Sequence, residues 1–173
     1  LRTIGGDEYC GAFQACSSLV SVTIPEGVTT IEEGAFKGCS SLVSVSLPST
    51  LSLIGGTIGG IEDRGAFCGC SSLASVTLPA GVTTIKEGAF YGCSSLASVT
   101  IPGGVTTIEA FVFEDCSSLA SLTIPEGVTT IGVNAFHNCS SLASLKIPDG
   151  VYWIGKGAFS GCSSLASVTI PVG

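Results

Sequence analysis

Polar and apolar residues recur in a fixed order along this chain, and residues 93–115 show the order most clearly. Residues 98–101 read Ser-Val-Thr-Ile, and this alternation is typical of a β-strand with one buried face. Pro102 follows, and we expect it to end the strand because proline has no amide hydrogen to donate to a sheet. The pattern therefore predicts one short strand at the start of the segment.

The remainder of the segment predicts a second apolar side. Val105 and Ile108 flank two threonines, and we expect both to point back toward the interior. The run Gly88-Ala89-Phe90 represents the next element, in which small residues permit a tight bend and the phenylalanine fills the middle. The residues that we expect to be buried are Leu96, Val99, Ile101, Val105, Ile108, Phe113 and Cys116.

This pattern repeats along the whole chain. Five of the six intervals between successive Cys-Ser-Ser-Leu runs are 23 residues, and one is 31. A fixed period of this size is typical of stacked repeats, because a single repeat cannot bury its own apolar face. The sequence therefore predicts a β-rich solenoid of about seven coils over residues 1–173. The runs begin at Cys16, Cys39, Cys70, Cys93, Cys116, Cys139 and Cys162.

Two coils depart from the period. The 31-residue interval contains four glycines in a short stretch, which predicts an insertion loop at about 53–67. The first coil also contains extra residues between Ile4 and Phe13. Such insertions either bind partners or are tolerated at small entropic cost. The sequence begins and ends within a repeat, so we also expect it to be a segment of a longer array.

Composition limits the classes of partner. Apolar residues make up 45% of the chain and charged residues only 11%, a balance that argues against disorder. The net charge of −7 disfavours binding to nucleic acid or anionic lipid. No apolar run reaches the roughly 18 residues of a membrane span. We therefore expect no nucleic-acid partner and no direct membrane span.

Seven of the nine cysteines occupy one position of the repeat. Equivalent residues in neighbouring strands lie roughly 4.8 Å apart with parallel side chains, whereas a disulfide needs its Cβ atoms to face each other. The seven cysteines that begin the repeats are therefore predicted to form a buried ladder of free thiols. Cys10 and Cys68 fall outside the ladder, and we expect their thiols to be exposed.

The repeat also resembles a known family. The spacing L-x-x-L-x-L, followed by I-x-x-x-A-F-x-x-C-S-S-L, is similar to the BspA-like class of leucine-rich repeats. Leu96, Val99, Ile101, Ile85 and Phe90 carry this likeness. The resemblance implies a right-handed, slightly curved coil with a parallel sheet on its concave face, short second strands and little helix. It further implies an extracellular or cell-surface adhesion module that binds host or matrix proteins.

Candidate chemistry is sparse. His137 is the only histidine, which excludes a histidine-based metal cluster, and we expect it to be a solvated surface residue. Cys68 and Cys70 lack the second pair of ligands that a zinc site needs. Adjacent acids such as Glu114 and Asp115 are interpreted as solvated edges rather than an acid–base pair. We expect no catalytic residue, no cofactor and no metal.

The outward positions offer a different kind of site. Serine and threonine recur there in files, but one threonine pair is replaced by Tyr152 and Trp153 near Lys146 and Asp149. Aromatic residues are enriched among those that dominate binding, so these four residues are the candidate partner-binding site. The alternative is that the aromatic side chains contact a neighbouring coil.

Three functions fit these observations. The leading hypothesis is a non-catalytic protein–protein interaction or adhesion module whose partner is a matrix or host protein. The alternative is a structural scaffold subunit whose partner is another subunit of a larger complex. A third, weaker hypothesis is binding to ice or another crystal surface through the regular hydroxyl files.

Overall fold

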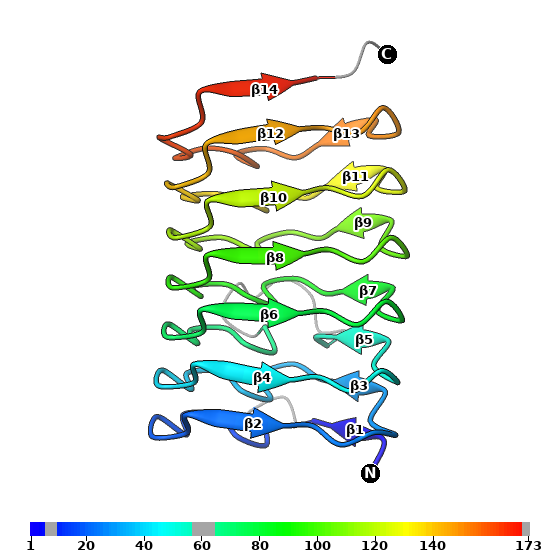
Figure 1. Ribbon diagram of the computed structural model, residues 1–173, viewed down its shortest axis with the longest axis vertical. Helices are drawn as coiled ribbons and strands as arrows, with labels where there is room; N and C mark the ends of the chain where they lie inside the picture. The colour runs from blue at the N-terminus through cyan, green and yellow to red at the C-terminus, as the bar shows by residue number, and fades with distance from the viewer. Residues whose placement is uncertain (6–9, 57–64, 171–173) are drawn as a thin grey trace.

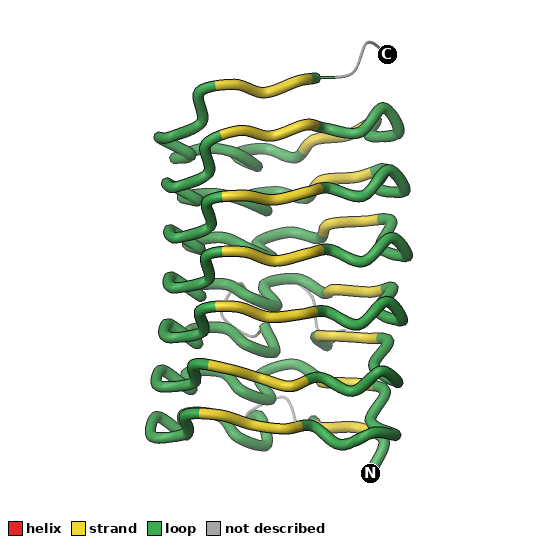
Figure 2. Tube along the Cα trace, in the orientation of Figure 1, coloured by secondary structure: helices red, strands yellow, loops and turns green. Residues whose placement is uncertain are grey.

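Each repeat forms one turn of a parallel β-solenoid in the computed structural model, which describes residues 1–5, 10–56 and 65–170. Figure 1 shows two columns of strands, one of three-residue strands and one of two-residue strands. Turns and loops join them, and no helix occurs in the described residues (Figure 2). The predicted solenoid and its parallel strands are thus confirmed.

The strand bounds follow the repeat. The long-strand column consists of β2 (Ser21–Thr23), β4 (Ser44–Ser46), β6 (Ser75–Thr77), β8 (Ser98–Thr100), β10 (Ser121–Thr123), β12 (Ser144–Lys146) and β14 (Ser167–Thr169). The short-strand column consists of β1 (Thr3–Ile4), β3 (Thr30–Ile31), β5 (Leu53–Ile54), β7 (Thr84–Ile85), β9 (Thr107–Ile108), β11 (Thr130–Ile131) and β13 (Trp153–Ile154).

Strands pair in the register of the repeat. Ser98 pairs with Ser75 on one side and Ser121 on the other. The 31-residue interval keeps the same register, because Leu53 pairs with Thr84. Each column is divided into separate hydrogen-bonded sheets. The long-strand column contains the sheets β2-β4, β6-β8-β10 and β12-β14, and the short-strand column contains β1-β3-β5-β7 and β9-β11-β13.

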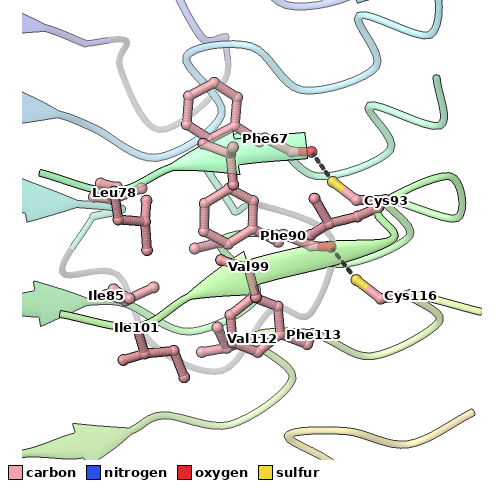
Figure 3. Close-up of a cluster of buried hydrophobic side chains, with 14 of the residues drawn as sticks. Phe67, Leu78, Ile85, Phe90, Cys93, Val99, Ile101, Val112, Phe113 and Cys116 are labelled. Carbon is pink, nitrogen blue, oxygen red and sulfur yellow. Dashed lines mark hydrogen bonds between the residues drawn. The ribbon is translucent and has the colours of Figure 1, made fainter. Parts of the chain in front are cut away.

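A column of phenylalanine rings runs through the centre of the stack. Consecutive rings from Phe13 to Phe159 are stacked, with centroids 5.2 to 5.6 Å apart. Figure 3 shows the central rings among the buried aliphatic side chains. All seven residues predicted to be buried belong to this core. The periodic apolar positions therefore build one continuous interior.

The thiol ladder is bound to the phenylalanine column. Cys93 Sγ donates to the carbonyl oxygen of Phe67 at 3.2 Å, and Cys116 Sγ donates to that of Phe90 at 3.3 Å (Figure 3). The same bond recurs from Cys39, Cys70, Cys139 and Cys162. All nine cysteines are free thiols, as the ladder prediction required of its seven members.

The burial of the cysteines corrects two predictions. Cys68 is buried rather than exposed, because its short side chain occupies the same repeat position as the longer Lys37 and Tyr91 of the adjacent coils. Cys16 is exposed and Cys162 half-buried, whereas the other five ladder cysteines are buried. Both lie in outer coils, where fewer neighbouring groups pack against the thiol. Cys10 is exposed, as predicted.

The insertion is narrower than 53–67. Leu53 and Ile54 form β5, which pairs on both sides. At the other end, Ala66 and Phe67 are fully buried in the core. Their apolar side chains follow the repeat, so they pack as their equivalents do. Residues 57–64 of the predicted loop lie outside the described residues.

Candidate interaction surface

The long-strand column presents a face of hydroxyl groups. In β8 the side chains of Ser98 and Thr100 are exposed while Val99 is buried between them. This arrangement follows from the strand, in which successive side chains point to opposite faces. Serine occupies the first position of all seven long strands, and the third position is threonine or serine except at Lys146. The result is a neutral, hydrogen-bonding surface with a fixed repeat.

Lys146 is the cationic exception on this face, and its ammonium group is paired. Its Nζ lies 3.1 Å from Glu126 Oε1 of the preceding coil. Both side chains are largely exposed, so the ion pair contributes little to folding stability. Asp149 is exposed in the turn that follows β12.

The predicted aromatic pair is on the other column. Tyr152 is 81% exposed and Trp153 45% exposed. Trp153 begins β13 and pairs with Thr130 of β11 through the backbone. The four candidate residues are therefore spread along one coil, because Lys146 ends β12, Asp149 lies in the following turn and Trp153 begins β13. The Lys146 ammonium group contacts Glu126. Their role in partner binding stays a prediction.

A polar pair that the sequence interpretation missed lies in the turn before the thiol ladder. His137 Nδ1 lies 2.7 Å from Glu114 Oε1, and Glu114 is only 7% exposed. Its other carboxylate oxygen, Oε2, is buried without a hydrogen-bond partner. Beside this pair, Asn138 Nδ2 donates to Asp115 Oδ1 at 2.9 Å.

This pair corrects the expectation that Glu114 is solvated, whereas the His137 side chain is 30% exposed. The two residues are 23 positions apart, so the coil register places them side by side. The sequence did contain a signal for this contact, because it has an acid and a histidine at the same repeat position of adjacent coils. A search for adjacent acids along the sequence could not find it, because the contact is between coils.

The buried thiols are chemically protected. Burial, followed by the neighbouring Cys39 thiol, raises the pKa of Cys70 to about 12. Burial also raises the pKa of Cys93 and Cys116 well above the usual thiol range. Since the thiolate is the nucleophile and metal ligand, these cysteines act as packing groups. In the described residues, no three His, Cys, Asp or Glu side chains are grouped as metal ligands.

Comparison with known proteins identifies the class. Residues 9–58 and 61–173 match the BspA type leucine rich repeat region, in six copies. The chain therefore belongs to the BspA type leucine-rich-repeat family, as its repeat suggested. No curated protein matches the chain. In the described part of the chain, no helix could cross a membrane.

Two solved bacterial structures extend this comparison. A leucine-rich-repeat protein of T. pallidum is 37% identical, with a TM-score of 0.78; the match covers 88% of this chain and 70% of that one. A leucine rich cell surface protein of Faecalibacterium prausnitzii A2-165 is 26% identical, with a TM-score of 0.51. That match covers 91% of this chain and 61% of the other.

Proposed function

We propose that this chain is a non-catalytic protein-binding module that acts in adhesion at a cell surface. The observation that carries the proposal is the long-strand face, where all seven strands carry serine at the first position and all but β12 carry serine or threonine at the third. Its partner is a matrix or host protein. The similarity to a cell surface protein of F. prausnitzii supports the location.

The geometry suits binding without chemistry. The face is held by strands whose side chains are already ordered, so a partner meets a preorganised surface and loses less conformational entropy on binding. Hydroxyl groups both donate and accept hydrogen bonds, which suits a polar protein surface. A hydroxyl face alone gives modest affinity, so we assign the main energetic contacts to Tyr152 and Trp153, whose rings are exposed.

The test is binding to immobilised, purified collagen, fibronectin and laminin, measured by biolayer interferometry. The paired substitution Tyr152→Ala and Trp153→Ala is expected to weaken binding at least about tenfold, the effect of losing an aromatic anchor. The matched control is Thr106→Ala with Thr107→Ala, which changes exposed residues at the same repeat positions of another coil. Circular dichroism of both variants checks that the solenoid is intact.

Each outcome bears on the proposal. Loss of binding in the aromatic variant alone supports the assignment of Tyr152 and Trp153. Equal binding by both variants and the native chain removes these two residues from the site. Absence of binding to all three matrix proteins contradicts the proposed partner class.

A further inference from the structure

Neighbouring strands of the long-strand column are not all hydrogen-bonded equally, and a second candidate surface lies where two of them do not pair. A backbone hydrogen bond precedes each strand contact, and it is 2.8 Å long from Val43 N to Val20 O. It lengthens to 3.4 Å from Ala74 N to Val43 O, and shortens again to 3.0 Å from Ala97 N to Ala74 O. Among the described strands, β4 and β6 are neighbours (Figure 1) but do not pair as strands, and the same holds for β10 and β12, where the bond from Ala143 N to Ala120 O is also 3.4 Å long. We call the first of these two places the β4–β6 seam.

One apolar side chain that is buried in most other coils is accessible at this seam. Leu47 is half-buried, whereas its equivalents Ile24, Leu78, Ile101, Ile124 and Ile147 are buried. Val45 is half-buried, as are its equivalents Val22 and Leu122. Next to them Val20 and Val43 are 57% and 46% exposed. From the third coil onward alanine replaces both valines. The first coils therefore carry an apolar surface that the later coils lack.

A depression of about 510 Å³ lies at the seam. Val45, Leu47 and Pro79 supply its apolar lining, and Ser46 and Thr77 supply hydroxyl groups. Its volume lies within the range of about 300 to 1,000 Å³ that is usual for ligand clefts. A depression of this kind can receive an apolar side chain while its hydroxyl groups bond to a peptide backbone.

The charge at the depression comes from Glu26. Its carboxylate accepts hydrogen bonds from Ser49 N and Ser49 Oγ, each 3.0 Å long. The Ser49 amide and then its hydroxyl lower the pKa of the Glu26 carboxyl, so the group stays ionised at neutral pH. In the described part of the chain, no lysine or arginine pairs with Glu26.

The chain itself shows what this position accepts. Glu126 is the equivalent of Glu26 four repeats later, and Lys146 is the equivalent of Ser46. There the Lys146 ammonium group forms an ion pair with the Glu126 carboxylate, with Nζ 3.1 Å from Oε1. Glu26 follows β2 and borders the depression from the first coil, and there Ser46 stands where the lysine would be. A cation from another molecule can take that place.

We propose that the β4–β6 seam binds an extended segment of a partner protein, with one apolar side chain in the depression and an adjacent lysine or arginine on Glu26. This inference rests on the proposed protein-binding function and names a second contact for it. The apolar residue provides the burial, and the basic residue fixes the direction of the segment along the seam.

The test uses two acetylated peptides, Thr-Lys-Leu-Thr-Val-Thr and the same peptide with glutamate in place of lysine. Titration into the ¹⁵N-labelled chain is followed by the amide resonances of Val45, Leu47 and Thr77. The lysine peptide is expected to shift these resonances and to bind at least about fivefold more tightly than the glutamate peptide, an effect of opposite against like charge at the rim.

Matched variants separate charge from fold. Glu26→Gln is expected to remove most of the preference for the lysine peptide, whereas Glu126→Gln leaves it unchanged. Thr77→Lys places an ammonium group in the depression and is expected to abolish the binding of the lysine peptide. Absence of shifts at the seam, or an unchanged preference in Glu26→Gln, overturns the inference.

The same data distinguish this inference from the proposed function. Matrix-protein binding that persists without any peptide binding leaves the adhesion proposal standing and removes the seam. Peptide binding at the seam without matrix-protein binding supports the seam and contradicts the matrix partner.

Discussion

Removing the Phe90 ring tests whether the phenylalanine column holds the solenoid together. Phe90 is fully buried, and its ring stacks on Phe67 at 5.5 Å and on Phe113 at 5.6 Å. Replacing a buried phenylalanine by alanine costs about 3–5 kcal/mol through lost burial and the remaining cavity. Because both ring faces lose a partner, we expect Phe90→Ala to cost about 4 kcal/mol, in the middle of that range.

Phe159 provides the matched control. It stands at the end of the described column, is half-buried and stacks on one ring only, that of Phe136 at 5.4 Å. With one stacking partner and less burial, Phe159→Ala is expected to cost about 2 kcal/mol, roughly half the effect at Phe90. The two variants thus compare the same substitution with two neighbours and with one.

Urea denaturation followed by far-ultraviolet circular dichroism gives both free energies of unfolding. Hydrogen exchange locates the damage, which we expect in the coils that flank Phe90, because each coil contacts only its neighbours. Equal losses in the two variants would show that ring stacking along the column is not what distinguishes the positions. A loss below about 1 kcal/mol at Phe90 would refute its role in the core.

The remaining predictions concern the buried polar groups and the turns. Burial raises the pKa of Cys70 from 9.0 to about 12, so the unfolded chain loses this proton at a lower pH than the folded chain. The free energy of unfolding is therefore expected to fall as pH rises from about 9 toward 12, by up to about 1.4 kcal/mol per pH unit for each such thiol. Urea midpoints at several pH values measure this fall, and a flat profile in that range contradicts the prediction. His137→Ala leaves the Glu114 carboxylate buried without its partner and is expected to cost about 1–3 kcal/mol of folding stability, measured by urea denaturation at pH 7. The control is the double variant His137→Ala with Glu114→Gln. If the double variant is no more stable than His137→Ala alone, the unpaired carboxylate is not the cause of the loss. Gly92 has φ of 69°, so Gly92→Ala is expected to cost about 1–2 kcal/mol of folding stability. Gly92→Asn is expected to cost less, because Asn138 adopts φ of 59° at the same repeat position. Thermal unfolding compares the two variants, and equal losses would count against backbone strain as the cause.

The sequence predicts the interior of this protein well because the interior is periodic. Leucine at the position of Leu96 and phenylalanine at that of Phe113 recur in every coil, and their burial in the inner coils follows from one alternation and one period. The parallel register follows for the same reason, since stacking equivalent residues is the arrangement that buries all of them together. The outer coils depart, as Cys16, Phe13 and Ile154 show by their exposure, because burial there also depends on the number of neighbouring coils.

The exterior was harder to predict because its contacts join different coils at variable positions. Burial of Cys68 depends on its short side chain together with the longer Lys37 and Tyr91 at the same repeat position of the adjacent coils. The contact between Glu114 and His137 arises from two substitutions 23 residues apart. The β4–β6 seam depends on small changes in strand spacing, with one hydrogen bond lengthening to 3.4 Å. No residue type in the repeat encodes that spacing directly.

The periodic interior and the variable exterior together indicate that partner specificity comes from the residues that differ from the repeat. A partner that contacts only Ser98, Thr100 and their equivalents meets nearly the same surface at every coil, so this face by itself cannot fix where the partner sits. Residues that break the repeat on the outside do so without disturbing the core, as Lys146 does on β12, where the neighbouring Leu145 stays buried. The exposed Val20 and Val43 distinguish the first coils, and Tyr152 and Trp153 distinguish a late one. A partner long enough to reach both would bind in a single register, because sliding by one coil would lose contacts at both places.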